Sequence, residues 1–127
     1  MLNPSLLLMT LACLLATPAA ASPTVPPAAF PAELQGIWNP APYDCGSSPE
    51  AENDMRFEVA GPLRMNHEDI ETALSVSELP GTPQAWRLTT ASNVVGDAEG
   101  QSRIYVLGAR YLFVTDGDRM DQYLQCR

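Results

Sequence analysis

Lysine is absent from this chain of 127 residues, and histidine occurs only once. Seven arginines face fifteen acidic residues, so the formal net charge is −8, and every charged residue lies beyond residue 32. Phosphate backbones and anionic lipid surfaces are bound largely through clusters of lysine and arginine. No such cluster occurs here, which argues against nucleic acid and against membrane surfaces as partners.

No apolar run is long enough to cross a membrane as a helix. From Leu6 to Ala16 the chain is apolar apart from Thr10, which is the length of a signal-peptide core. Ala19-Ala20-Ala21 then supplies the small residues that signal peptidase recognises. The sequence therefore predicts a signal peptide over 1–21 and a mature chain exported to the periplasm or secreted by a bacterium, with no membrane insertion.

Cysteine is scarce, with three residues in all. Cys13 lies inside the apolar run, and its lipidation is an alternative, although Thr10 stands where lipoproteins carry a leucine-like residue. Removal of the leader leaves Cys45 and Cys126, and two cysteines in an oxidising compartment are expected to pair. The predicted disulfide would join the first structured stretch to the last.

Proline is concentrated directly after the leader. Residues 22–32 carry four prolines in eleven positions, and proline fixes φ and removes a backbone donor. We therefore expect an extended arm or tether here, either a spacer or an arm that docks on a partner. Residues 33–127 remain for a single β-domain.

Period-two alternation of apolar and polar residues dominates the chain from residue 56 onward, and no helical pattern precedes it. Turn residues interrupt this alternation roughly every ten positions. The pattern predicts an all-β fold of seven to eight short strands, arranged as a small antiparallel up-and-down barrel. A β-sandwich is the alternative.

The last quarter of the chain predicts two tight hairpins, through Gly108-Ala109 and Asp116-Gly117. Two-residue loops would pair Val106 with Tyr111 and Phe113 with Met120, and would point Cys126 inward. Val106, Tyr111 and Cys126 would then share the inner face of these strands. The other face carries several charges, which mark it as the outside, but it also carries more apolar side chains than a solvent-exposed face usually does. That bulk predicts either a covered face or a candidate partner surface, made of Tyr105, Leu107, Leu112 and Tyr123.

Four aromatic residues are expected to point inward and fill the barrel. An eight-stranded barrel is only wide enough for side chains or one small ligand, so this filling argues against a ligand cavity. The predicted core anchors are Trp38, Phe57, Trp86 and Phe113.

Catalytic and metal-binding patterns are missing. His67 lacks a serine or cysteine nucleophile and an orienting carboxylate in a recognisable motif, so we interpret it as an exposed turn residue. Asp116, Asp118 and Asp121 resemble part of a calcium loop but lack its glycine and distal glutamate. The sequence therefore assigns no catalytic residue, no metal ligand and no cofactor.

The Gly36-Ile37-Trp38 segment followed by Cys45 resembles the start of small exported lipocalin-like barrels of bacteria. Among these it is most similar to the periplasmic inhibitors of secreted metalloproteases, whose amino-terminal arm enters the protease cleft. The resemblance implies an eight-stranded barrel. In those inhibitors the second cysteine follows soon after the first, whereas here it is Cys126. The ending Tyr-x-x-Cys-Arg, residues 123–127, also resembles short exported proteins of unassigned function.

These observations predict a non-enzymatic exported binding module that acts through a protein surface on a periplasmic or secreted protein. Inhibition of a hydrolase is a special case. A carrier of a small apolar ligand in the barrel mouth and a structural, envelope-associated protein are the alternatives. The sequence does not fix the oligomeric state.

Overall fold

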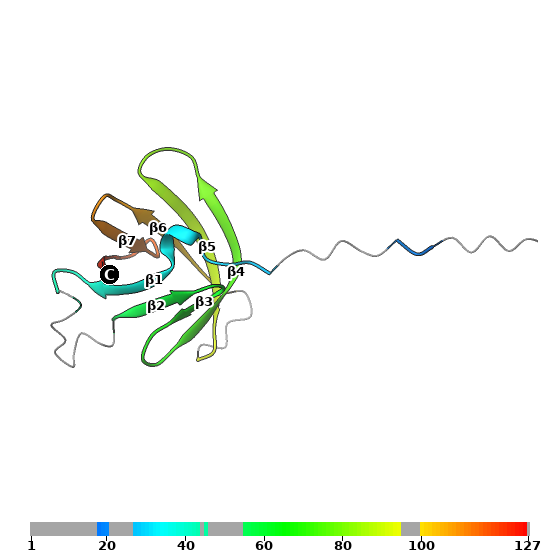
Figure 1. Cartoon of the computed structure of the whole chain (residues 1–127), viewed down its shortest axis with the longest axis horizontal. Coiled ribbons are helices and arrows are strands. Elements are labelled where there is room, and N and C mark those ends of the chain that lie inside the picture. The colour runs from blue at the N-terminus through cyan, green and yellow to red at the C-terminus, as the bar shows by residue number, and fades with distance from the viewer. Residues whose placement is uncertain (1–17, 21–26, 44, 46–54, 95–99, 127) are drawn as a thin grey trace, which may run out of the picture.

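The chain folds as a closed eight-stranded antiparallel barrel in which each strand pairs with the next and the last pairs with the first (Figure 1). The structure, a computed structural model, describes residues 18–20, 27–43, 45, 55–94 and 100–126. This topology confirms the predicted up-and-down barrel and excludes the sandwich. The strands are β1 (Gly36–Pro40), β2 (Phe57–Ala60), β3 (Leu63–Met65), β4 (Ile70–Leu79), β5 (Gln84–Ser92), β6 (Gln101–Leu107), β7 (Tyr111–Thr115) and β8 (Met120–Cys126).

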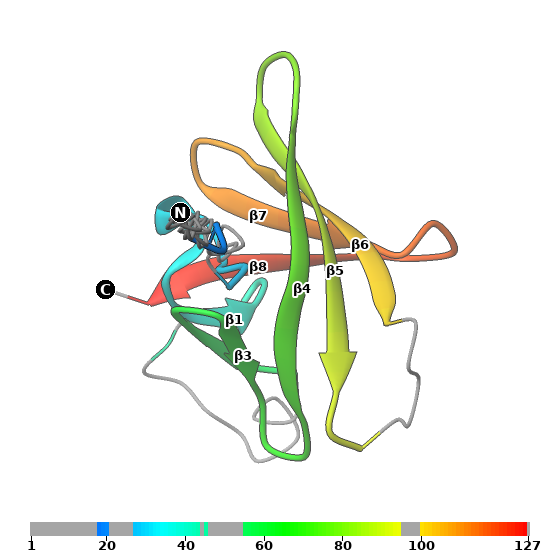
Figure 2. The same cartoon turned by 90° about the vertical axis from the view of Figure 1, so that its right-hand side faces the viewer.

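The first and last strands close the barrel side by side, as Figure 2 shows. Ile37 of β1 pairs with Cys126 of β8. Cys126 forms a disulfide with Cys45, and their Cα atoms lie 5.5 Å apart. The predicted pairing is therefore confirmed, and it links the segment that follows β1 to the end of β8.

The segment before β1 closes one end of the barrel. A 3₁₀ turn, η1 (Ala32–Leu34), places Leu34 in the core, and the indole Nε1 of Trp38 donates a 2.9 Å hydrogen bond to the Leu34 carbonyl. Phe30 is also buried, and its backbone N–H donates to the Gly61 carbonyl. Phe30 therefore belongs to the folded domain, although the sequence assigned it to the proline-rich arm. The leader and the rest of that arm lie outside the described residues, apart from residues 18–20 and 27–32.

The core consists of the inward-facing side chains of the barrel wall together with Phe30 and Leu34. Trp38, Phe57 and Trp86 are buried in it. Phe113 is not a core residue, contrary to the prediction. It is half-buried on the outer face of β7, because the neighbouring Leu112 and Val114 are the buried residues and successive side chains of a strand alternate between faces.

The predicted partner surface lies inside the barrel. Tyr105 and Leu112 are 0% exposed, Tyr123 is 3% exposed, and Leu107 is half-buried against the core. The inference that charges mark the outer face was wrong, because this inner face carries charged residues that line a hollow described below. By the same alternation, Cys126 lies on the outer side of β8 and not in the interior.

The register of the last two hairpins differs from the prediction by two residues. Val106 pairs with Phe113 rather than Tyr111, and Met120 pairs with Thr115. Both connections are longer than two-residue loops. Since side chains alternate with a period of two, a shift of two residues leaves every residue on its predicted face. The grouping into two faces was correct, and only the choice of the inner one was reversed.

Candidate functional site

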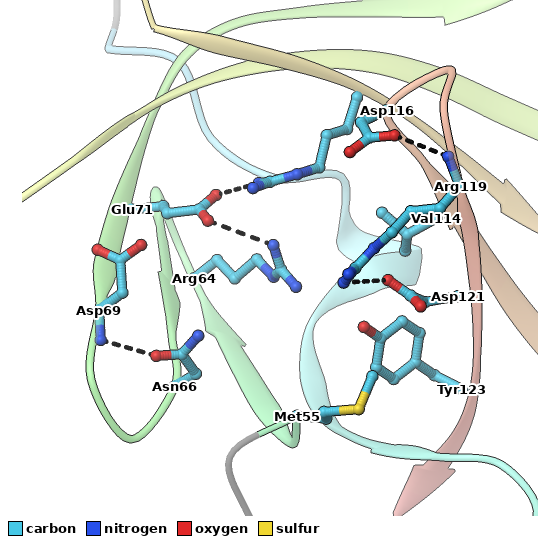
Figure 3. A pocket seen from close by; sticks show the side chains of 11 residues that line it. Met55, Arg64, Asn66, Asp69, Glu71, Val114, Asp116, Arg119, Asp121 and Tyr123 are labelled. Atoms are coloured by element: carbon cyan, nitrogen blue, oxygen red, sulfur yellow. Dashed lines mark hydrogen bonds and ion pairs between the residues drawn. The ribbon is translucent and has the colours of Figure 1, made fainter. Parts of the chain in front are cut away.

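A charged hollow of about 330 Å³ lies at the barrel end opposite to Phe30 and Leu34. It is formed where the β3–β4 and β7–β8 turns approach the ends of the strands (Figure 3). We call this hollow the mouth. Its lining residues are Met55, Arg64, Asn66, Asp69, Glu71, Arg103, Val114, Asp116, Arg119, Asp121 and Tyr123.

Glu71 is the buried acid of the mouth, with 5% of its surface exposed. It lies near the start of β4, where its own side chain and that of Ala73 point inward while Ile70 and Leu74 point outward. A register shift between Ala73 and Ser75 follows directly. The first half of β4 therefore presents a carboxylate to the interior and exposes the larger apolar side chains of Ile70 and Leu74.

Two arginines and a hydroxyl surround the Glu71 carboxylate. Its Oε2 accepts a hydrogen bond of 2.6 Å from Nη1 of Arg103 and one of 2.8 Å from Oγ1 of Thr90. Its Oε1 lies 3.4 Å from Nη1 of Arg64. A buried carboxylate needs such partners, because an isolated buried charge is strongly disfavoured.

The pKa of Glu71 reflects a competition between burial of the carboxyl group and the surrounding cations and hydrogen-bond donors. Burial alone would raise the pKa, but the nearby Arg64 and Arg103 charges and the hydrogen bonds from Arg103 and Thr90 lower it below its ordinary value. For Arg103, burial lowers the pKa, but Glu71 raises it more strongly. The pair is therefore ionised in the folded protein.

Arg64 is the least satisfied ion of the cluster. Its guanidinium lies over the Phe57 ring, with Cζ 4.2 Å from the ring centroid. Its only ion pair among the described residues is the 3.4 Å contact with Glu71, and its buried Nε has no hydrogen-bond partner there. An arginine offers five N–H donors, so Arg64 retains donor capacity at the bottom of the mouth.

Two phenols lie beside these arginines. Tyr123 packs edge-on against Phe57, with centroids 4.8 Å apart, and its hydroxyl points into the hollow toward the Arg119–Asp121 ion pair, with Arg64 to one side (Figure 3). Tyr105 lies deeper, and its buried hydroxyl interacts with the Arg103 guanidinium. Burial raises the pKa of both tyrosines, so both hydroxyls stay protonated and can donate.

The rim of the mouth is acidic. Oδ1 of Asp69 accepts a hydrogen bond from the Ser92 hydroxyl. Oδ1 of Asp116 accepts two from the backbone of its own turn, at Asp118 and Arg119, and these bonds lower the pKa of Asp116. Asp121 pairs at 3.1 Å with the mostly exposed Arg119.

Other residues singled out from the sequence lie elsewhere. His67 is exposed in the β3–β4 turn and does not line the mouth. Asp116 and Asp121 line the rim but Asp118 does not. The part of the chain that the structure describes holds no group of three His, Cys, Asp or Glu side chains arranged to bind a metal ion.

The sequence missed Arg64, Glu71 and Arg103. Each stands in a strand where apolar and charged residues alternate, and a charged residue in such a strand is normally placed outside. The sequence did carry one signal. On β6 the face that bears Arg103 is as apolar as the other face, because Tyr105 and Leu107 lie on the same side as Arg103. Tyr123 was identified from the sequence but placed on the wrong face.

The fold and the mouth define a small disulfide-closed β-barrel with a charged hollow at one end. No family model, no curated protein and no solved structure matches the chain. Among the described residues, no helix has the length and apolar character needed to cross a membrane.

Proposed function

We propose that the protein is an exported, non-enzymatic binding module that takes a small polar ligand into the mouth. The observation that carries this proposal is Arg64, which lines a hollow of about 330 Å³ and whose guanidinium has, among the described residues, only one ion pair, the 3.4 Å contact with Glu71. Hollows of roughly 300 to 1,000 Å³ are typical of small-molecule sites. A ligand that accepts hydrogen bonds from Arg64 would offset the cost of burying it.

The chemistry of the lining favours a polar ligand over an apolar one. Three arginines and four carboxylates line the mouth, and only Met55 and Val114 are aliphatic or thioether side chains. An apolar ligand would desolvate these ions without replacing their hydrogen bonds, which is costly. This replaces the apolar carrier predicted as an alternative from the sequence.

The state of Glu71 supports a binding role rather than acid–base catalysis. A general acid or base works best when its pKa lies near the working pH. The two arginines lower the pKa of Glu71 instead, so this carboxyl is a fixed anion that holds Arg103 in place.

Export rests on the disulfide and on the predicted leader. The Cys45–Cys126 bond is consistent with an oxidising compartment outside the cytoplasm. The leader itself lies outside the described residues. A periplasmic or secreted location therefore stays a proposal, which cell fractionation tests.

A thermal-shift screen tests the proposed function. A ligand that binds only the folded state raises the midpoint of unfolding as its concentration increases. We expect this rise from a compound in a panel of amino acids, organic acids, sugars and polyamines, and not from fatty acids. Arg64→Lys should reduce the rise, whereas Arg87→Lys, the same change at an exposed position of β5, should not. A rise unaffected by Arg64→Lys contradicts binding in the mouth.

Binding of a protein partner through the outer wall is a second candidate. Apolar side chains lie next to one another on the outer faces of β6, β7 and β8, where Val106 pairs with Phe113 and Tyr111 pairs with Leu124. Apolar patches of this kind often mark partner surfaces. Inhibition of a secreted metalloprotease, which the resemblance of residues 36–45 implies, is the special case.

Titration of secreted metalloproteases tests this second candidate. Phe113→Ser should weaken any inhibition, and Ile70→Ser, at an exposed position of β4, is the matched control. Inhibition that both variants retain in full excludes the outer wall as the binding surface.

A further inference from the structure

We infer that the ligand of the mouth is a small zwitterion, bound with its carboxylate against Arg64 and Tyr123 and its ammonium group toward the aspartates of the rim. This inference rests on the proposed function and narrows it to one class of ligand. The class includes the free amino acids.

The bottom of the mouth carries net positive charge. Arg64 and Arg103 lie there with Glu71 as the single carboxylate between them. Arg103 already uses Nη1 for Glu71 and Nη2 for Gln101. Arg64 has only its 3.4 Å contact with Glu71 among the described residues, and its Nε is buried without an acceptor. A second carboxylate at Arg64 would balance the two arginines.

Tyr123 provides an additional donor at the same place. Its hydroxyl points into the space beside Arg64 (Figure 3), and burial raises its pKa, so the proton is retained. A guanidinium and a phenol that converge on one space match the two oxygens of a carboxylate. The Phe57 ring holds both groups, since it contacts Arg64 by a cation–π interaction and Tyr123 edge-on.

The rim has the opposite sign. Asp69, Asp116 and Asp121 lie there with Arg119 as the single cation. In total the mouth is lined by four carboxylates and three arginines, and a simple anion would have to pass the acidic rim to reach Arg64. A doubly charged phosphate would be repelled most strongly. A zwitterion adds no net charge and complements both ends, with the carboxylate inside and the ammonium group outside.

The size of the hollow limits the ligand. At about 330 Å³ the mouth is near the lower end of the range for small-molecule sites. Phe30 and Leu34 are buried at the other end of the barrel, so the interior is not an open channel. A free amino acid or a similarly small zwitterion fits this description better than a long peptide.

Calorimetric titration of the disulfide-intact chain tests the inference. The twenty standard amino acids are titrated one at a time, and the tightest binder is compared with its amide and its N-acetyl derivative. The amide lacks the carboxylate and the N-acetyl form lacks the ammonium group. We expect each derivative to bind at least tenfold more weakly, since each leaves one charged end of the mouth without its partner.

Two substitutions locate the ends of the ligand. Tyr123→Phe keeps the ring packed on Phe57 and should weaken binding of the parent amino acid by about two- to tenfold, as expected for the loss of one hydrogen bond. Its effect on the amide, which has no carboxylate, should be smaller. Asp121→Asn should weaken binding of the parent amino acid more than binding of its N-acetyl derivative. Asp118→Asn removes the same charge at an exposed position outside the mouth, and it should leave the affinity for both compounds unchanged.

The outcomes separate this inference from the proposed function. If inorganic phosphate, acetate or a polyamine binds in the mouth and no amino acid does, the zwitterion inference is overturned while the proposed function stands. Equal affinity for an amino acid and both of its derivatives also overturns it. If no polar probe binds at all, both proposals fail.

Discussion

The Arg103 guanidinium donates a 2.6 Å hydrogen bond to the Glu71 carboxylate inside the barrel, joining β6 to β4 across the wall that β5 forms between them. The two residues are 32 positions apart in the sequence, and neither would be placed inside by its own polarity. Their mutual neutralisation makes a charged interior compatible with a closed β-barrel. It also provides the rigid support against which Arg64 is held.

Removal of one member of this pair should destabilise the fold. Glu71→Leu leaves the partly buried Arg103 and Arg64 without their carboxylate. Breaking a fully buried pair costs about 3 to 5 kcal/mol, so the loss here should be at or below the lower end of that range. The double variant Glu71→Leu, Arg103→Met should be less destabilised than Glu71→Leu alone, because the orphaned charge is removed as well. Urea denaturation of Glu71→Leu, of Arg103→Met and of the double variant measures this. Strictly additive effects, within about 0.5 kcal/mol, would show that the residues do not interact.

The protein should lose stability in acid partly through Glu71. The folded-state pKa of this carboxyl is lowered below its ordinary value of 4.5, so its stabilising effect is present above that value and is lost as pH falls through the folded pKa. The free energy of unfolding should therefore decrease below about pH 4.5. Asp116, whose pKa is lowered by backbone N–H groups of its turn, acts in the same direction.

Comparison of two variants isolates the part due to Glu71. Glu71→Gln should flatten the acid limb of the stability curve relative to the wild type. Glu78→Gln, at an exposed position of the same strand, is the control and should leave the limb unchanged. An identical acid limb in Glu71→Gln and in the wild type would contradict the assigned role.

The inward orientation of Tyr105 and Tyr123 can be measured by alkaline titration. Burial raises the pKa of both phenols above the ordinary value of 10.0. A phenol whose pKa is raised favours the folded state below its unfolded pKa, and this contribution is lost as pH rises through the folded pKa. The ultraviolet absorbance of phenolate should show late-titrating groups, of which Tyr105→Phe removes one and Tyr123→Phe the other. Early titration of both would instead place them on the surface.

Phe30 should behave as a core residue despite its position in the proline-rich stretch. Its ring lies edge-on to Tyr105, with centroids 6.1 Å apart, and is buried at the closed end of the barrel. Phe30→Ala should lower the free energy of unfolding by about 3 kcal/mol, which is usual for a buried phenylalanine. Met120→Ala, at a side chain that is 64% exposed, should change it by less than about 0.5 kcal/mol. Similar small effects in both variants would show that residues before 33 do not belong to the domain.

The alternation of apolar and polar residues was sufficient to predict the barrel, because period two and frequent turn residues are local properties of the chain. It also grouped the residues of β6, β7 and β8 correctly into two faces. It could not decide which face was inside. Ile104 and Val106 on one face of β6 are as apolar as Tyr105 and Leu107 on the other. The charge of Arg103 then led to the wrong prediction that its face lies outside.

The site was harder to predict than the fold because it depends on contacts between distant strands. Arg64, Glu71 and Arg103 come from β3, β4 and β6, and each looks like an ordinary solvent-facing residue in its own strand. Only closure of the barrel brings their charges together. Phe30 was missed for a similar reason, since its neighbours indicate an extended arm and its burial depends on the Gly61 turn and on Tyr105.

The most direct test of the account is a map of amide chemical shifts during titration of the isotope-labelled protein with the amino acid that binds most tightly. The account predicts that the largest changes occur at Arg64, Glu71, Arg103 and Tyr123, the residues of the mouth. Changes centred on Val106 and Phe113 of the outer wall, or no saturable change for any polar compound, would contradict it.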